Sequence, residues 1–197
     1  MKENNNNNNI QLIDLGLPSG NLWADRNIGA DSPEQVGLYF AWGETEGFTD
    51  EQVVAGVRSF NRSSYKAKEI TADLTPEQDA ARAYLGENFH MPTWEDFGEL
   101  LANCKATWTD NYKGTKVSGY VFSSKTNGNS TFFPVAGFCC NSSVFGSDGD
   151  YWSASWYSPS YAWGLDFNFG SQTMNNDRRF YGQPVRGVCK KRRTFIT

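Results

Sequence analysis

The fold is decided by residues 161–169, YAWGLDFNF, in which a large apolar residue occupies every second position. Successive side chains of a β-strand point to opposite faces, so this spacing predicts a strand with one buried face. The side chains expected to point inward are Trp163, Leu165 and Phe167, and those expected to point outward are Asp166 and Asn168. The parity of Phe169 also places it on the inward face.

Working outward from this strand, the same alternation separates Arg178 and Phe180 from Arg179 and Tyr181. Short β-like runs broken by Gly, Asn and Ser fill the rest of the C-terminal half, at 117–123, 131–136, 151–155 and 184–189. Near the N-terminus, 10–15 and 21–24 are also expected to be extended. Helices first and strands later in one short chain predict an α+β fold.

Two segments carry helix start signals. Thr75 precedes Pro76 and predicts a helix to about residue 85, and Thr93 predicts a second helix to about residue 103. The apolar positions of the second helix have helical spacing, so we expect them to face the core: Trp94, Phe97, Leu100 and Leu101. A short helical turn is expected from Pro33 toward Tyr39, and residues 45–70 are expected to be mostly loop.

Composition limits the possible functions. The 197 residues are 15% aromatic but only 20% charged, with a net charge of −4. An acidic body repels phosphate backbones, so no nucleic-acid partner is expected. No apolar run approaches the roughly 20 residues of a membrane-spanning helix, and no apolar signal core follows Met1. We therefore expect no membrane insertion and no signal peptide.

The chain is expected to hold one domain. Residues 1–9 are an Asn-rich leader, expected to be disordered, and residues 190–197 are a basic tail. Between them, residues 10–189 have the length of a single domain with its own core.

Catalytic and metal-binding patterns are weak. His90 is the only histidine, and a lone histidine beside aromatic residues is more often structural than catalytic. The four cysteines, Cys104, Cys139, Cys140 and Cys189, show no Cys-x-x-Cys spacing and are expected to be thiols. Asp148 and Asp150 offer two carboxylates to a hard cation, but a polar turn is the favoured interpretation. Neither an enzyme activity nor a cofactor nor a metal is predicted.

The composition of residues 151–181 is typical of a binding surface. Ten of these 31 residues are aromatic, and most of the others are Ser, Asn, Asp or Gly. Aromatic side chains give contact area with little entropy to lose, while small polar residues supply adaptable hydrogen bonds, as in antibody paratopes. For any single aromatic residue here, a place in the core remains the alternative.

Several blocks of the sequence resemble a known family. They are DLGLPSGNLWA at 14–24, YFAWGE at 39–44, MPT at 91–93, FPVAG at 133–137, YWS at 151–153 and the YG and VR pairs at 181–182 and 185–186. These blocks resemble the Fibrobacter succinogenes major paralogous domain family, found in gut Bacteroidetes and their phages. The resemblance runs in order from about Leu12 to Cys189.

This family is similar to the variable proteins of diversity-generating retroelements, in which adenine-directed mutagenesis rewrites a C-terminal segment. The resemblance implies a C-type lectin fold, with short helices around small twisted antiparallel sheets and with the N- and C-terminal strands close together. It also implies a variable segment at 139–188. The positions matching family scaffold slots are Trp152, Ser153, Leu165, Phe167, Arg179, Tyr181, Gly182, Val185 and Arg186.

The positions between the scaffold slots are expected to form one exposed ligand-binding surface. They are Asn141, Phe145, Trp156, Tyr157, Ser158, Ser160, Tyr161, Asp166, Asn168, Phe169, Gln172, Asn175, Asp177, Arg178 and Phe180. The implied function is non-enzymatic receptor binding, to a protein or a glycan, in a phage virion or inside a cell. A homo-oligomer is compatible with it.

Departures from related families leave alternatives open. Gln183 and Pro184 are followed by Val185, and no Trp-Asn-Asp occurs, so calcium-dependent sugar binding is not expected. The vicinal Cys139 and Cys140 keep open an oxidase like the formylglycine-generating enzymes, which share the broad fold. A structural subunit of a virion is the third hypothesis.

Overall fold

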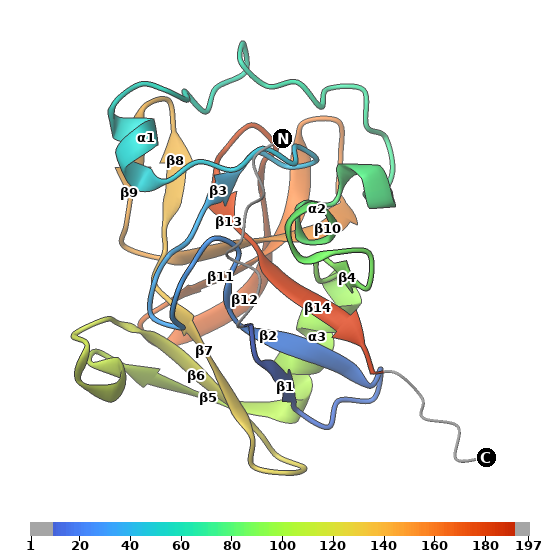
Figure 1. Cartoon of the computed structure of the whole chain (residues 1–197), viewed down its shortest axis with the longest axis vertical. Coiled ribbons are helices and arrows are strands. Elements are labelled where there is room, and N and C mark those ends of the chain that lie inside the picture. The colour runs from blue at the N-terminus through green and yellow to red at the C-terminus, as the bar shows by residue number, and fades with distance from the viewer. Residues whose placement is uncertain (1–9, 192–197) are drawn as a thin grey trace.

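Short strands and a few short helices make up residues 10–191, the part of the chain that this computed structural model describes (Figure 1). The helices are α1 (Asp50–Val54), α2 (Ala80–Leu85) and α3 (Trp94–Asn103), with 3-10 turns η2 (Pro76–Gln78) and η3 (Tyr112–Gly114). The strands are β1 (Leu12–Asp14), β2 (Asn21–Asn27), β3 (Tyr39–Phe40), β4 (Phe89–His90), β5 (Cys104–Thr109), β6 (Gly119–Ser124), β7 (Ser130–Pro134), β8 (Phe138–Cys140), β9 (Ser143–Phe145), β10 (Gly149–Trp156), β11 (Tyr161–Asn168), β12 (Ser171–Arg178), β13 (Gln183–Pro184) and β14 (Arg186–Lys190). The fold is α+β, as predicted.

The two ends of the described chain meet in one sheet of order β1-β2-β14-β4. Strand β14 pairs antiparallel with β2, with Val188 opposite Trp23, and both side chains are fully buried. Figure 1 shows the red β14 running beside the blue β2. The closeness of the N- and C-terminal strands, expected from the resemblance, is therefore present.

A second sheet, of order β10-β11-β12, holds most of the segment that the sequence singles out. Leu165 and Phe167 are each 1% exposed, whereas Asp166 is half-buried and Asn168 is exposed, as the alternation predicted. Trp163 was also predicted to point inward, but its side chain is only half-buried. It lies against Trp94 and Tyr157, at ring centroid distances of 6.4 and 4.8 Å.

Helix α3 begins where the sequence predicted. The hydroxyl of Thr93 accepts a hydrogen bond from Asp96 N, and the Asp96 carboxylate accepts one from Thr93 N, which is a capping box. Phe97 and Leu100 are buried, but Trp94 is 42% exposed, so the expectation that it faces the core was wrong. The Trp94 ring contacts that of Trp163 on β11, and Trp94 N donates to the Ser155 hydroxyl on β10 at 3.0 Å.

Other predictions needed correction. The helix predicted from Thr75 is split at Asp79 into η2 and α2, because the Asp79 side chain caps a new helix at Arg82 N. Residues 33–35 form a turn and a bend, residues 36–38 have no regular structure, and α1 interrupts the loop expected at 45–70. Leader residues 1–9 and residues 192–197 of the basic tail lie outside the described residues.

Three apolar clusters support the sheets. One gathers α3 and strands β5 to β7 against β10 and β11, around Trp23, Phe97 and Phe133. A second gathers α2 around Trp42 and Trp152, and a third gathers Tyr39, Phe60 and Tyr65. The four cysteines are free thiols, and none of the described helices is long and apolar enough to cross a membrane.

Candidate functional site

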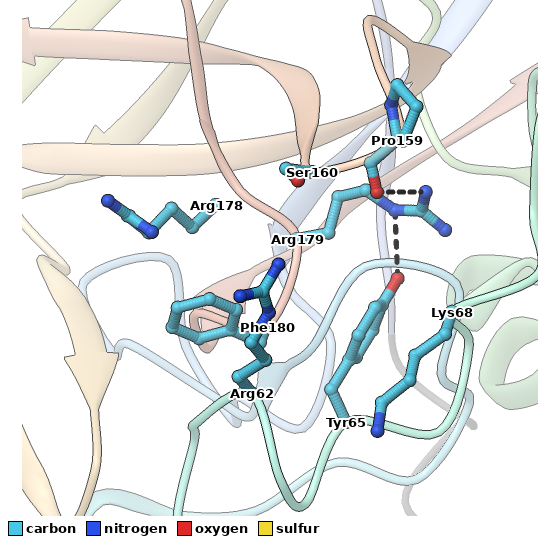
Figure 2. Close-up of a pocket in the computed structure, with 8 residues that line it drawn as sticks. All are labelled: Arg62, Tyr65, Lys68, Pro159, Ser160, Arg178, Arg179 and Phe180. Atoms are coloured by element: carbon cyan, nitrogen blue, oxygen red, sulfur yellow. Dashed lines mark hydrogen bonds between the residues drawn. The ribbon is translucent and has the colours of Figure 1, made fainter.

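A pocket of about 180 Å³ opens where the 58–70 loop meets the ends of β11 and β12. Three chain segments line it, as Figure 2 shows. The lining residues are Arg62, Tyr65, Lys68, Pro159, Ser160, Arg178, Arg179 and Phe180. The last two segments belong to the predicted variable region, and the first comes from more than 90 residues earlier in the chain.

Arg179 forms the wall that joins these segments. Its side chain is 1% exposed, and its guanidinium donates to four neutral oxygens. The acceptors are the Tyr65 hydroxyl at 3.0 Å and the carbonyls of Ala67, Ile70 and Pro159 at 2.6 to 3.0 Å. The guanidinium also lies over the Trp42 ring, 4.7 Å from its centroid. One buried side chain thereby fixes both the 65–70 loop and the β10-β11 turn.

Tyr65 transmits this order to the rest of the loop. Its hydroxyl accepts from Arg179 and donates to the Trp42 carbonyl at 2.8 Å, and burial raises its pKa to about 12. Nearby, the buried Glu44 carboxylate pairs with Arg58 at 2.7 Å and accepts from Lys66 N at 2.7 Å. The loop that carries Arg62 and Lys68 is thus tied to the core at several points.

The rim of the pocket is cationic and aromatic. Arg62, Lys68 and Arg178 are exposed, and within the described chain none of them has a carboxylate at ion-pair distance. The Arg178 guanidinium lies near the rings of Tyr161 and Phe180, at 5.8 and 5.9 Å from their centroids. In Figure 2 the Arg62 guanidinium is directed toward Ser160 and Arg179, whereas that of Arg178 points away from them.

All fifteen residues predicted for the binding surface are at least partly exposed. Three of them, Ser160, Arg178 and Phe180, line the pocket. A row of ring contacts links Phe180 to Phe145: Phe180 meets Tyr181 at 5.1 Å, and Phe138 bridges Tyr181 to Phe145 at 5.0 and 5.1 Å. Tyr161 lies beside Arg178, Asn141 pairs with Phe60, Trp156 ends β10, and Tyr157 and Ser158 belong to the β10-β11 turn that also carries Pro159 and Ser160.

Two groups of predicted residues lie elsewhere. Asn168, Phe169 and Gln172 surround the β11-β12 turn, where Phe169 is 77% exposed and contacts Trp108 at 5.8 Å. This turn is a strand length from the pocket, roughly 23 Å at about 3.3 Å per residue. The expectation that the parity of Phe169 turns it inward was wrong, because β11 ends at Asn168 and Gly170 reverses the chain with a φ of 94°.

The second separate group lies over a small acidic hollow. Asp166, Asn175 and Asp177 line it together with Asp150 and Gln183. Asp150 is 6% exposed, and both its Oδ2 and the Gln183 Oε1 are buried without a hydrogen-bond partner. Burial, with the nearby carboxylates of Asp166 and Asp177, raises the pKa of Asp150 to about 8. Asp150 is the second residue of strand β10, so the favoured interpretation of a polar turn at 148–150 was wrong for this residue.

Sequence patterns did not indicate Arg62, Tyr65 or Lys68 as site residues. They lie in a polar loop with no motif or periodicity, and nothing in the sequence indicates that the loop folds back onto β12. Arg179 offered the nearest indication of this loop contact. Its place in the alternation, opposite Arg178 and Phe180, and its match to a family scaffold slot predicted that it belongs to the scaffold. A buried arginine needs acceptors from outside its own strand.

The surroundings of the candidate catalytic residues, His90 and Cys139, favour a structural role for both. His90 Nε2 lies 3.7 Å from the buried Asp96 carboxylate that caps α3. Cys139 is fully buried, and burial raises its pKa to about 12, which disfavours the thiolate that a cysteine-pair oxidase would need. Within residues 10–191, no three His, Cys, Asp or Glu residues are grouped so as to hold a metal ion.

Comparisons with known proteins found no matching family model, no matching curated protein and no matching solved structure. The family resemblance of the sequence blocks therefore stays a prediction. The geometry of the pocket and the separation of buried and exposed positions along 139–188 are the features that bear on function.

Proposed function

We propose that this chain is a non-enzymatic binding protein with a C-type lectin fold, whose segment 139–188 presents a diversified surface to a protein or glycan receptor. The pairing of β2 with β14, the small antiparallel sheets and the short helices support this fold. Three of the motif blocks that resemble the family each contribute a fully buried tryptophan, namely Trp23, Trp42 and Trp152.

One observation carries the proposal: scaffold and contact positions separate cleanly in burial. Eight of the nine scaffold positions are buried, and the ninth, Tyr181, is half-buried. None of the fifteen contact positions is buried, although many alternate with scaffold positions residue by residue. A surface of this kind can change its side chains without changing the core, which is what diversification requires.

The chemistry of the surface around the pocket suits receptor recognition. Tyr157 is 45% exposed, Phe145 is 49% exposed, and Arg178 lies beside two aromatic rings. Aromatic and arginine side chains dominate the energetics of most protein interfaces. The scaffold beneath them is held by Arg179 and by Trp152, whose indole N–H donates to the Phe40 carbonyl at 2.9 Å. A preorganised surface loses less entropy on binding.

Arrays of glycans and of purified bacterial surface proteins test this proposal. We expect the purified full chain to bind at least one class of immobilised ligand. The combined variant Tyr157→Ala, Ser160→Ala, Arg178→Ala and Phe180→Ala should lose about tenfold or more in affinity, since contact aromatic and arginine residues carry most of the binding energy.

The matched control is Lys105→Ala with Lys190→Ala, two exposed residues on β5 and β14 away from the pocket (Figure 1). It should bind as the original chain does. Binding that survives in a folded fourfold variant, or an absence of binding on both arrays, would contradict the proposal. In the genome, a neighbouring reverse transcriptase gene and a near-copy of the segment encoding 139–188, differing at adenines, would support diversification.

A further inference from the structure

The pocket beside Arg179 has an unbalanced charge. Four of its eight lining residues are cationic, namely Arg62, Lys68, Arg178 and Arg179, and no Asp or Glu lines it. The chain as a whole has a net charge of −4, so this is a cationic site on an acidic molecule. Low-dielectric walls around charges of one sign focus their field and attract ions of the opposite sign.

The buried member of this set lacks a counter-ion. Arg179 is 1% exposed, and all four of its hydrogen-bond acceptors are neutral oxygens. A guanidinium has five N–H donors, so one donor remains without an acceptor in the described chain. A buried charge is costly unless it is paired. The space next to Arg179 that can hold a counter-ion is this pocket.

Three acidic residues in this part of the chain are already engaged. Glu44 pairs with Arg58 at 2.7 Å, and Glu46 pairs with Lys66 at 3.3 Å. The Asp177 carboxylate accepts from Gln183 Nε2 at 2.9 Å and lines the separate acidic hollow. Arg62, directed toward Ser160 and Arg179 in Figure 2, is therefore left without a partner, as is Lys68 beside Tyr65.

The size and the neutral groups of the pocket narrow the ligand further. A volume of about 180 Å³ suits one small ring, and a larger ligand would extend out of the open pocket. The Phe180 ring offers an apolar face, and the Ser160 hydroxyl offers both a donor and an acceptor. Together with the cations, these groups match a single sugar ring that carries an anionic substituent.

We propose that this pocket binds an acidic sugar, a ring bearing a carboxylate or a sulfate, with Arg62 facing the anion and Phe180 against the ring. The inference rests on the proposed binding function and names the class of ligand for it. Arg179 supplies a fixed positive field from the wall, Lys68 adds positive charge at the rim, and Arg62 makes the direct contact. A planar guanidinium such as that of Arg62 suits a carboxylate better than an ammonium does.

Calorimetric titration of the full chain with glucuronate, glucose and sodium sulfate tests the inference. Glucuronate should bind at least about tenfold more tightly than glucose, which has the same ring without the carboxylate. It should also bind more tightly than sulfate, which has the charge without the ring. Raising the salt from about 0.05 to 0.5 M should weaken glucuronate binding severalfold, because exposed charges are screened.

Substitutions test which residues cause the preference for glucuronate over glucose. Arg62→Ala with Lys68→Ala should remove most of the preference for glucuronate over glucose, while Arg62→Lys should retain part of it. The control Lys105→Ala with Lys190→Ala has the same change in net charge away from the pocket and should leave the preference unchanged. Equal binding of glucuronate and glucose, no binding of glucuronate, binding of sulfate as tight as that of glucuronate, or equal effects of the two double variants would overturn the inference.

Failure here is distinguishable from failure of the proposed function. If glucuronate does not bind but an array ligand is lost in the fourfold surface variant, then the binding function stands and the acidic-sugar inference fails. If no array ligand binds and glucuronate does not bind, then both fail.

Discussion

At the scale of single residues, Arg179 belongs to the scaffold and to the pocket at once. Its guanidinium holds carbonyls from Ala67, Ile70 and Pro159, so removing it would release two loops together. The same charge forms one wall of the pocket. The hydrogen bonds of its guanidinium explain how a charged residue can point inward within 178–181 in a stable fold. The alternation predicted its direction, but the four acceptors come from distant loops that a sequence pattern does not reveal.

Asp150 is the residue whose burial is least compensated. Its carboxyl group is 6% exposed and has no hydrogen-bond partner among the described residues. Asp166 lies directly opposite it on β11, and Asp177 and Asp148 add further negative charge. Burial and these neighbours raise its pKa to about 8, so the folded chain keeps a proton on Asp150 at neutral pH.

This proton makes stability depend on pH. An aspartate in the unfolded chain has a pKa of about 3.9, so between about pH 4 and pH 8 the folded chain holds a proton that the unfolded chain has released. The contribution of Asp150 to the free energy of unfolding should therefore fall as pH rises through this window and level off above it.

The substitution Asp150→Asn should remove that dependence, because an amide resembles the protonated acid and does not titrate. We expect the free energy of unfolding of the variant to exceed that of the original chain by roughly 1–3 kcal/mol at pH 8.5, with a smaller difference at pH 5. Urea denaturation across this pH range measures it, with the exposed Asp110→Asn as control. A constant difference across the range would show that Asp150 does not hold the proton.

At the scale of elements, the sequence predicted those whose signal is local. The alternation in β11 placed Leu165 and Phe167 correctly, and the Thr93 cap placed the start of α3 correctly. Strand β12, SQTMNNDR, was not predicted, because its residues are mostly polar and have low strand propensity. It is a strand because it pairs with β11 along its whole length, from Tyr161 opposite Arg178 to Asn168 opposite Ser171.

The candidate site was predictable only in part, for the same reason. Ser160, Arg178 and Phe180 lie in a segment whose composition is typical of binding surfaces, so they were found. Arg62 and Lys68 come from a loop that gains its position through Tyr65 and Arg179, which are contacts between distant parts of the chain. The distribution of the contact residues over three places also depends on strand ends and turns, which residue spacing does not reveal.

The packing of β10 against β11 gives a test at this scale. A Cβ added at Gly149 would overlap the ring of Phe167, which is 1% exposed, while a Cβ at Gly146 would meet nothing within 4 Å. Gly149→Ala should therefore cost about 1–3 kcal/mol in the free energy of unfolding, the usual cost of overpacking a core. Gly146→Ala, three residues away, should change it by less than about 0.5 kcal/mol in the same urea denaturation. Equal stability of the two variants would show that β10 and β11 do not pack in this way.

At the scale of the whole molecule, the many aromatic residues form two separate populations, one buried and one exposed. Buried rings such as Trp23, Trp42 and Trp152 belong to two of the three core clusters. Exposed rings such as Tyr157 and Phe145 belong to the region around the pocket, where the local charge is positive although the chain is acidic overall. We infer that the exposed population can change in sequence while the buried population, and with it the fold, stays the same.

Thermal unfolding of a multiply substituted chain tests this central claim most directly. In the surface variant, five contact residues become outcomes typical of adenine mutagenesis: Tyr157→Asn, Ser160→Tyr, Tyr161→Asn, Arg178→Ser and Phe180→Asn. Four of these changes should each cost about 0.5 kcal/mol or less and Phe180→Asn, whose half-buried ring packs against the third cluster, about 1.5 kcal/mol, so the midpoint should fall by no more than about 14 °C. The scaffold variant Leu165→Asn with Phe167→Asn buries two amides in the core and should leave no cooperative transition. A surface variant that loses its transition as the scaffold variant does would contradict the claim.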